Sequence, residues 1–371
     1  MTHGITQTES LVGPRPLVTA ATAVIGLVAI SATAETDTFP LNTAVLLTNP
    51  RAAIADAGAG THLAKCLTTI TTICSPQIVV VRVAAGLNAD ATEDNIIAGI
   101  ALLESAQSVT GVKPRILGVP GYDTQAVTTA LVATAKKLRA FVYASCDTAD
   151  TVAEAVDYRD EYGDRELMLL YPDFTGYTGE AIASAMGLRA LIDHTKGWHH
   201  SLSNNIVSGV TGISRAISWN MQGSGTDAAA LNAAPVTTII RNTGYRFWGL
   251  RTCSDEPLYA FEVATRTNFV IQDTIDEGLL WAMDKPITAQ LIKDIIDSLN
   301  NKAREFVTSG RVIGLRFWYD PDVNKASDLA AGKVKIDYDF TPCAPLEDLG
   351  LTGRITDRYY ADLGAQLAQL G

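Results

Sequence analysis

The sequence predicts an α/β protein in which a parallel-sheet domain is followed by an α+β domain, with extended arms at both ends of the chain. Three observations predict this fold class. From residue 78 to about residue 193, short apolar strands alternate with amphipathic helices, which is the pattern of a parallel sheet covered on both faces. After about residue 198 the alternation stops, and Gly, Ser and Asn become frequent. The C-terminal tail has too few core-forming residues to be a domain.

The chain length sets the expected number of domains. With 371 residues the chain is long for a single domain, so two are expected. We place an N-terminal arm at residues 1–20, an α/β domain at 21–197, an α+β domain at 198–350 and a C-terminal arm at 351–371. The first strand of the α/β domain could equally belong to the α+β domain. Extended arms can bind by adding a strand to an exposed sheet edge of a neighbouring molecule.

The uncharged run at residues 16–34 is expected to supply the first strand. The run also imitates a secretory signal peptide, because Arg15 precedes it and small residues end it. Glu9 lies upstream and threonines dilute the apolar run, so a buried strand near residues 24–30 is the favoured interpretation. Thr151 and Glu154 form a possible capping box at the start of a helix. Further strands are predicted at 44–48, 78–83, 115–119, 140–144 and 167–171, and further helices at 62–73 and after Asp123.

The second half of the chain begins with a predicted hairpin. Residues 236–240 are β-branched and favour a strand, and the turn Asn242-Thr243-Gly244 follows, with glycine available for a positive φ. Helices are predicted at 267–283 and 288–307, and strands at 312–319 and 333–340. In the last strand the apolar residues alternate with charged ones, which indicates a half-exposed antiparallel strand. The residues expected to face inward are Val334, Ile336, Tyr338 and Phe340.

Composition argues against several classes of protein. The formal net charge is −11 and no dense run of Lys and Arg occurs, so a nucleic-acid partner is not expected. The five cysteines are widely spread without a C-x-x-C motif, which predicts neither a zinc site nor a disulfide framework and fits a reducing cytoplasm. Hydrophobic residues make up 47% of the chain, which leaves apolar surface for contacts between subunits.

The sequence contains no recognisable catalytic motif. It lacks G-x-G-x-x-G, G-x-x-x-x-G-K-[ST] and G-x-S-x-G, so we assign no catalytic, cofactor-binding or metal-binding residue and expect no cofactor. His194, His199 and His200 could form a metal or acid–base cluster, but their loop spacing favours a structural or solvated role. An α/β-fold hydrolase or oxidoreductase stays open as an enzyme alternative, and a secreted binding protein stays open as a second alternative.

Residues 236–256 carry a more specific signal, with the sequence VTTIIRNTGYRFWGLRTCSDE. This segment resembles the signature of tail sheath proteins from contractile phage tails and R-type pyocins, in which TTIIR is followed by GYR, an aromatic residue with Trp-Gly, and RT. The flanking segments GVTGIS at 209–214, WAMDKPIT at 281–288 and IDYDFTP at 336–342 agree in order and spacing. Leu250 departs from the Asn that family members often carry. The residues expected to hold this conserved domain together are Gly244, Arg246, Trp248, Gly249 and Arg251.

The resemblance implies a structural role. Sheath proteins stack as hexameric rings around a tail tube, exchange arm strands between subunits, and contract to drive the tube through the target cell envelope. The implied partners are further copies of the chain, the tail tube protein, and the baseplate and tail terminator proteins, with no direct membrane insertion. The implied location is the tail of a virion or particle assembled in the bacterial host cytoplasm. The α+β domain would lie nearest the tube and the α/β domain outside it.

Two sets of contact residues are expected from this resemblance. The polar face of the helix at 288–307 offers candidate contacts to an acidic tube, although a solvated helix face is the common alternative for such charges. The candidate tube contacts are Lys293, Lys302 and Arg304. The candidate inter-subunit arm residues are Ile5, Val12 and Leu17 near the start of the chain and Leu351, Ile355 and Tyr359 near its end.

Overall fold

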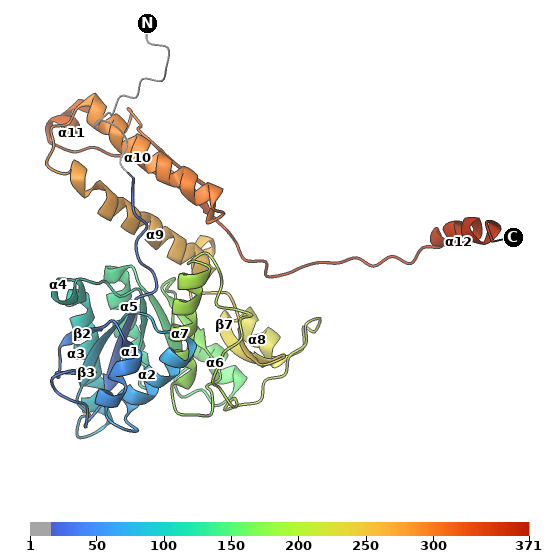
Figure 1. Ribbon diagram of the computed structural model, residues 1–371, viewed down its shortest axis with the longest axis horizontal. Coiled ribbons are helices and arrows are strands. Elements are labelled where there is room, and N and C mark those ends of the chain that lie inside the picture. The colour runs from blue at the N-terminus through green and yellow to red at the C-terminus, as the bar shows by residue number, and fades with distance from the viewer. Residues whose placement is uncertain (1–15, 371) are drawn as a thin grey trace, which may run out of the picture.

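The structure is a computed structural model that describes residues 16–370, except for the side chains of Ala361 and Ala365. Ile5 and Val12 therefore lie outside the described residues. Figure 1 shows three parts: a domain built on a large sheet, a projection of helices and strands that rises from it, and a C-terminal tail that runs away from both.

One mostly parallel sheet organises the larger domain. Its eight strands lie in the order β2-β3-β1-β4-β5-β6-β7-β8. Only the two edge strands are antiparallel to their neighbours, β2 to β3 and β8 to β7. The strands are β1 (Ile25–Ile30), β2 (Ala44–Leu47), β3 (Ile78–Val83), β4 (Ile116–Gly118), β5 (Phe141–Ser145), β6 (Leu167–Leu170), β7 (Val236–Arg241) and β8 (Tyr245–Trp248).

The strand predicted near residues 24–30 is confirmed as β1. It pairs in parallel with β3 on one side and β4 on the other, and all six of its residues are buried. This position explains its continuous apolar run, because a central strand of a covered parallel sheet has no solvated face. The hairpin predicted around residues 242–244 is likewise confirmed as β7 and β8.

Helices cover both faces of the sheet. One face packs against α2 (His62–Ile73) and α7 (Glu180–Thr195) around Leu67, Ile70 and Met186. The other face packs against α3 (Ala89–Leu102), α5 (Gln125–Leu138), α6 (Val152–Arg159) and α8 (Asp227–Ala233). The capping box at Thr151 and Glu154 is confirmed at the start of α6. Two shorter helices complete the domain, α1 (Pro50–Ala53) and α4 (Ala106–Thr110).

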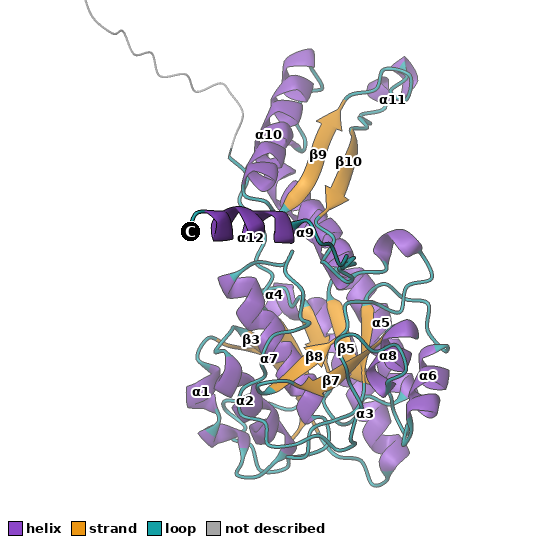
Figure 2. Cartoon of the chain, turned by 90° about the vertical axis from the view of Figure 1, so that its right-hand side faces the viewer, coloured by secondary structure: helices purple, strands orange, loops and turns teal. Residues whose placement is uncertain are grey.

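A smaller unit, here called the projection, follows the sheet domain in the chain. Its elements are α9 (Glu262–Leu279), α10 (Ala289–Thr308), β9 (Val312–Trp318), α11 (Ala326–Ala330) and β10 (Asp337–Pro342). β9 and β10 form a separate antiparallel sheet that lies beside α10, as Figure 2 shows. As expected, Ile336, Tyr338 and Phe340 pack against the small core of this unit, around Leu299 and Phe306.

Two of the observed boundaries differ most from the predicted ones. The domain boundary predicted at residue 198 falls inside the large sheet, because β7 and β8 come after it and extend the sheet beyond β6. The irregular segment that follows α7 interrupts the alternation of strands and helices without ending the sheet. The helix expected from residue 267 begins at Glu262. Its first turns were missed in the sequence because they carry charged residues, which interrupt the apolar pattern although they are buried.

The C-terminal tail leaves the projection after β10, which ends at Pro342. Residues 343–370 are called the C-terminal arm from here on, in place of the range from residue 351 expected from the sequence. It has no regular structure until α12 (Tyr359–Ala368), which lies far from the rest of the chain (Figure 1). Several large apolar side chains of the arm are exposed. They are Leu346, Leu349, Leu351, Ile355, Tyr359, Tyr360, Leu363, Leu367 and Leu370.

Candidate functional site at the joint between the sheet and the projection

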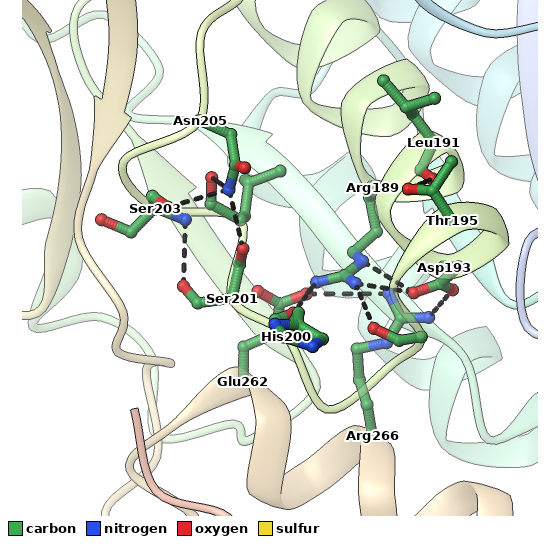
Figure 3. Close-up of polar contacts among 12 residues, drawn as sticks. Arg189, Leu191, Asp193, Thr195, His200, Ser201, Ser203, Asn205, Glu262 and Arg266 are labelled. Atoms are coloured by element: carbon green, nitrogen blue, oxygen red, sulfur yellow. Dashed lines mark hydrogen bonds and ion pairs between the residues drawn. The ribbon is translucent and has the colours of Figure 1, made fainter. Parts of the chain in front are cut away.

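A buried ion cluster joins the sheet domain to the projection (Figure 3). α7 supplies Arg189 and Asp193, and α9 supplies Glu262 and Arg266, each pair being one helical turn apart. Nη2 of Arg189 lies 2.7 Å from Oδ1 of Asp193, and Nη1 lies 3.3 Å from Oε1 of Glu262. Arg266 donates to the other carboxylate oxygen of Asp193. Two cations and two anions therefore balance within one buried site, here called the ionic joint.

Neutral groups add hydrogen bonds to the ionic joint, although Oε2 of Glu262 accepts none from the described residues. The hydroxyl of Tyr143, on β5, donates to Oε1 of Glu262 at 2.5 Å, and Nη1 of Arg189 donates to the carbonyl oxygen of His200 at 2.7 Å. Burial acts to lower the pKa of Arg189, but Asp193 and Glu262 outweigh it and hold that pKa above its usual range. Burial, and then Glu262, raise the pKa of Tyr143, so its hydroxyl stays a donor.

The energetics of the ionic joint depend on its completeness. Each charge removed from water costs several kcal/mol, which only well-placed partners offset. Arg189 has no exposed surface, so it depends on Asp193, Glu262 and the backbone carbonyls of the loop after α7. Such a site adds little net stability over an apolar core. The loss of one partner, however, leaves a buried charge without a counterion and so destabilises the fold. The ionic joint therefore fixes the start of α9 against α7 and β5 in a single arrangement.

A second ionic contact holds α9 further along its length. Asp273 accepts from Arg115 at 2.7 Å and from Arg139 at 2.9 Å, and Arg139 also reaches Asp276 at 2.5 Å. Burial lowers the pKa of Arg115, although Asp273 acts in the opposite direction. Glu262 and Asp273 are 11 residues apart, about 16 Å along a helix. The sheet domain thus grips α9 at two points, which makes the base of the projection rigid.

The signature residues Gly244, Arg246 and Gly249 lie in and beside the β7–β8 hairpin. Gly244 has φ 120° in the turn. Nη1 of Arg246 donates to the carbonyl oxygen of Asn204 at 2.7 Å and so ties the hairpin to the loop before it. A Cβ at Gly249 would lie 2.7 Å from the Cα of Thr237, so only glycine allows this close approach.

Trp248 and Arg251 reach towards the root of the C-terminal arm. Trp248 stacks edge-on against Trp219, with ring centroids 5.6 Å apart. Arg251 binds the carboxylate of Glu347 with Nε at 2.8 Å and Nη2 at 2.6 Å. Sequence reasoning found Arg251 but not Glu347, because the two residues are 96 positions apart and a lone glutamate carries no signal of its partner.

The three predicted tube contacts lie on the same helix but differ in exposure. Lys293 and Arg304 are exposed on α10. Lys302 is only 7% exposed, and its ammonium is held by the Glu305 carboxylate at 2.8 Å and lies over the ring of Phe306. The expectation that Lys302 offers a free charge therefore needs correction, because its position on the helix turns its stem into the core of the projection.

The predicted arm residues that the structure describes also differ in exposure. Leu17 is 7% exposed and packs in the core of the projection of its own chain, where a Cβ on Gly278 would meet its side chain. The interpretation of Leu17 as a contact to another subunit is corrected accordingly. Leu351, Ile355 and Tyr359 are exposed in the C-terminal arm, and their role as inter-subunit contacts stays a prediction.

The histidines of the loop after α7 pack with one another. The rings of His199 and His200 lie 4.5 Å apart, and His199 also contacts Trp198. Burial and the neighbouring His200 lower the pKa of His199 to about 4, so the ring is neutral at neutral pH. Within residues 16–370, no three His, Cys, Asp or Glu side chains are grouped so that they could hold a metal ion. Burial raises the pKa of the Cys66 thiol, beside His62, to about 12.

No helix within the described segment combines the length and the apolar character needed to span a bilayer.

Comparison with known proteins places the chain in a family. Residues 88–253 match the model of the phage tail sheath protein central domain, and residues 254–356 match that of the phage tail sheath C-terminal domain. The chain is 47% identical to the tail sheath protein of Escherichia phage P2, with 97% of each chain covered. It is 43% identical to the major tail sheath protein of Serratia phage KSP20, with 94% of this chain and 93% of the relative covered.

Solved structures share the fold at low sequence identity. The helical sheath of the anti-feeding prophage in its contracted state gives a TM-score of 0.74 at 16% identity, with 96% of this chain and 99% of that chain covered. The sheath complex of the extracellular contractile injection system PVC, also contracted, gives 0.71 at 14% identity, with 96% and 98% covered. Because both family models match and the two phage relatives are 43–47% identical over most of the chain, the chain belongs to the phage tail sheath family, whose members are structural, non-enzymatic components of virion tails.

Proposed function

We propose that this chain is the repeating subunit of a contractile sheath, stacked as hexameric rings around a tail tube, whose shortening drives the tube through the target cell envelope. One observation carries the proposal. The C-terminal arm extends far from its own subunit with its large apolar side chains exposed (Figure 1). A segment of this kind gains free energy by burying those side chains, at about 25 cal/mol for each Å² of apolar surface.

The projection offers a matching acceptor. β9 and β10 form a sheet of two strands, so each strand has one edge free of strand partners within the described residues. An arm from another copy can add a strand there, with backbone hydrogen bonds for affinity and alternate side-chain positions for register. Exchange of arms would keep subunits connected while their other contacts change. This supports Leu351 and Ile355 as inter-subunit residues.

The similar solved structures support the contractile part of the proposal. Two of them are sheaths in the contracted state, and a third belongs to the baseplate of the anti-feeding prophage, with a TM-score of 0.72 at 16% identity. We extend the same arrangement to this chain, with a baseplate at one end of the sheath and a tail terminator at the other. Contraction then corresponds to a switch between two packings of rigid subunits connected by their arms.

The proposal also includes an orientation of the subunit, which has the projection on one side and the sheet domain on the other. In the proposed arrangement the projection and the β7–β8 hairpin lie towards the tube, and the helices of the sheet domain lie outside. Lys293 and Arg304, which are exposed on α10, then face an acidic tube surface. Reversing both charges is expected to abolish binding to purified tubes while leaving tube-free polymers intact. Equal binding of the variant and the wild type to tubes would contradict this orientation.

Electron microscopy of the purified full-length chain tests the main proposal. Ordered hollow tubes with six-fold symmetry are expected, either on polymerisation alone or around added tube protein. The co-assembled polymers should exist in a long and a short form with the same number of subunits. Monomers that persist at high concentration with tube protein present would overturn the proposal.

A further inference from the structure

We infer that Arg251 and Glu347 form a positioning latch that fixes the direction in which the C-terminal arm leaves its subunit, and so selects the neighbouring copy that the arm reaches. The inference rests on the proposed function, because it requires arms to be exchanged between copies. Neither residue is part of the ionic joint. The latch acts instead on the root of the arm, where a rigid body gives way to an extended chain.

The Arg251 side of the latch is held in place by the subunit itself. The backbone of Arg251 forms a bridge with Phe261, and its guanidinium lies over the Phe261 ring, 5.2 Å from the centroid. Phe261 is the residue immediately before α9, so Arg251 is tied to the rigid base of the projection. The guanidinium fork is thus oriented for two parallel hydrogen bonds to one carboxylate, and this geometry specifies direction as well as contact.

The arm side of the latch forms part of the wall of a hollow beside the sheet domain. Pro345, Leu346 and Glu347 line a depression of about 390 Å³ together with Trp219 and Trp248. Leu346 is 76% exposed, so this part of the arm is held mainly through Glu347, by its paired contacts at 2.8 and 2.6 Å. Beyond Glu347, the hydrogen bonds described for the arm, at Thr356, Arg358 and Tyr359, stay within the arm. Among the described residues, Glu347 is thus the last point at which the subunit holds its arm by an ion pair.

The length of the free arm turns a small change at its root into a large one at its tip. From Glu347 to Tyr359 there are 12 residues, which span about 40 Å when extended. A change of about 30° in the exit direction would move the start of α12 by about 20 Å, more than the width of a β-strand ladder. Arms released from the latch would therefore meet the acceptor edge of the correct neighbour only rarely.

The latch is tested by charge reversal and charge exchange in the full-length chain. Arg251→Glu and Glu347→Arg are each expected to lower the yield of ordered tubes at least tenfold, measured by electron microscopy and sedimentation. The double exchange should restore ordered tubes, because the pair is re-formed with its charges swapped. The melting temperature of the unassembled subunit should change by no more than about 2 °C, because both side chains are over a third exposed.

A matched pair on the same subunit provides the control. Arg215 and Asp150 are exposed and lie 2.7 Å apart, and neither lines the depression beside Glu347. Their single reversals should leave the tube yield unchanged. Glu347→Gln keeps the size of the side chain and an acceptor oxygen, and it serves as a milder test if a single reversal disturbs folding. Its tube yield should lie between those of the wild type and Glu347→Arg.

The outcomes separate the latch from the function on which it rests. Tubes of wild-type chain with normal tubes from both single reversals would overturn the latch and leave the proposed function standing. Failure of the double exchange to recover tubes from correctly folded chains would overturn it as well. Wild-type chain that forms no tubes with tube protein would overturn the proposed function itself.

Discussion

Asp123 is a carboxyl whose environment favours its neutral form. It follows β4, is 4% exposed, and accepts a hydrogen bond from the backbone nitrogen of Ser145. Burial raises the pKa of Asp123 from 3.8 to about 6, with a smaller contribution from the nearby Asp173. Because the folded-state pKa lies above the unfolded one, the contribution of Asp123 to stability is fully present below about pH 4. It is lost as pH rises through 6.

Asp123→Asn is therefore expected to stabilise the chain at neutral pH. Asparagine keeps an acceptor for Ser145 and removes the buried charge, so the free energy of unfolding at pH 7.5 should rise by about 1–3 kcal/mol. The gain should shrink towards pH 4. Chemical denaturation at both pH values measures it, with the exposed Asp150→Asn as control. A variant less stable than the wild type at pH 7.5 would show that the charge is needed.

Gly249 shows a steric requirement at the residue scale. A methyl group there would lie 2.6 Å from Oγ1 and 2.7 Å from Cα of Thr237, on the neighbouring strand. Gly249→Ala is expected to lower the free energy of unfolding by about 1–3 kcal/mol, because β8 must shift away from β7. Gly225→Ala, where the added carbon meets nothing within 4 Å, is the control. Thermal melting of the two variants compares them, and equal stability would contradict the close approach.

At the scale of elements, α9 decides how the two parts of the chain are connected. Its first turns are buried although they carry Glu262 and Arg266, and its later turns are held through Asp273. Sequence reasoning recognised the amphipathic α10 and the β7–β8 hairpin, because helix periodicity and turn chemistry are local signals. It could not anticipate the ionic joint, because Arg189 and Glu262 are 73 positions apart and each resembles a surface charge in the sequence.

Glu262→Gln tests the importance of the ionic joint. The amide keeps the acceptor for Tyr143 but leaves two cations, Arg189 and Arg266, facing one carboxylate. The free energy of unfolding is expected to fall by about 3–5 kcal/mol. The same substitution at the half-exposed Glu347 should cost no more than about 1 kcal/mol. Urea denaturation of both variants measures the two losses of unfolding free energy. Equal losses would show that the ionic joint depends on Glu262 no more than the exposed pair depends on Glu347.

At the scale of the whole molecule, the described chain combines a body with buried cores and a long extension whose large apolar side chains are exposed. The sequence correctly indicated a mostly parallel sheet and a later antiparallel pair of strands. It misplaced the end of the sheet, because the irregular segment after α7 resembles a domain linker while β7 and β8 still pair with the sheet. It also assigned Leu17 to an arm, because an isolated leucine near a chain end does not reveal that α9 covers it.

Removal of residues 348–371 tests the division between body and extension. The truncated chain ends at Glu347 and so keeps the latch, and residues 348–370 lie outside the three buried cores. Its melting temperature is expected to stay within about 2 °C of the full-length subunit, because little buried surface is lost. Ordered tubes should not form. Normal tubes from the truncated chain would show that the arm is dispensable for assembly.

The contact between Arg251 and Glu347 also has a mechanical consequence. The backbone of the arm continues from β10, so tension on the arm alone would enter the thin β9–β10 sheet and peel it strand by strand. Arg251 diverts part of that tension to the end of β8, and Phe261 passes it to Glu262, the next residue and a member of the buried charge network on the large sheet. A subunit pulled through its arm is thereby loaded on the eight-stranded sheet as well as on the two-stranded one, which favours transmission of force to its neighbours without unravelling.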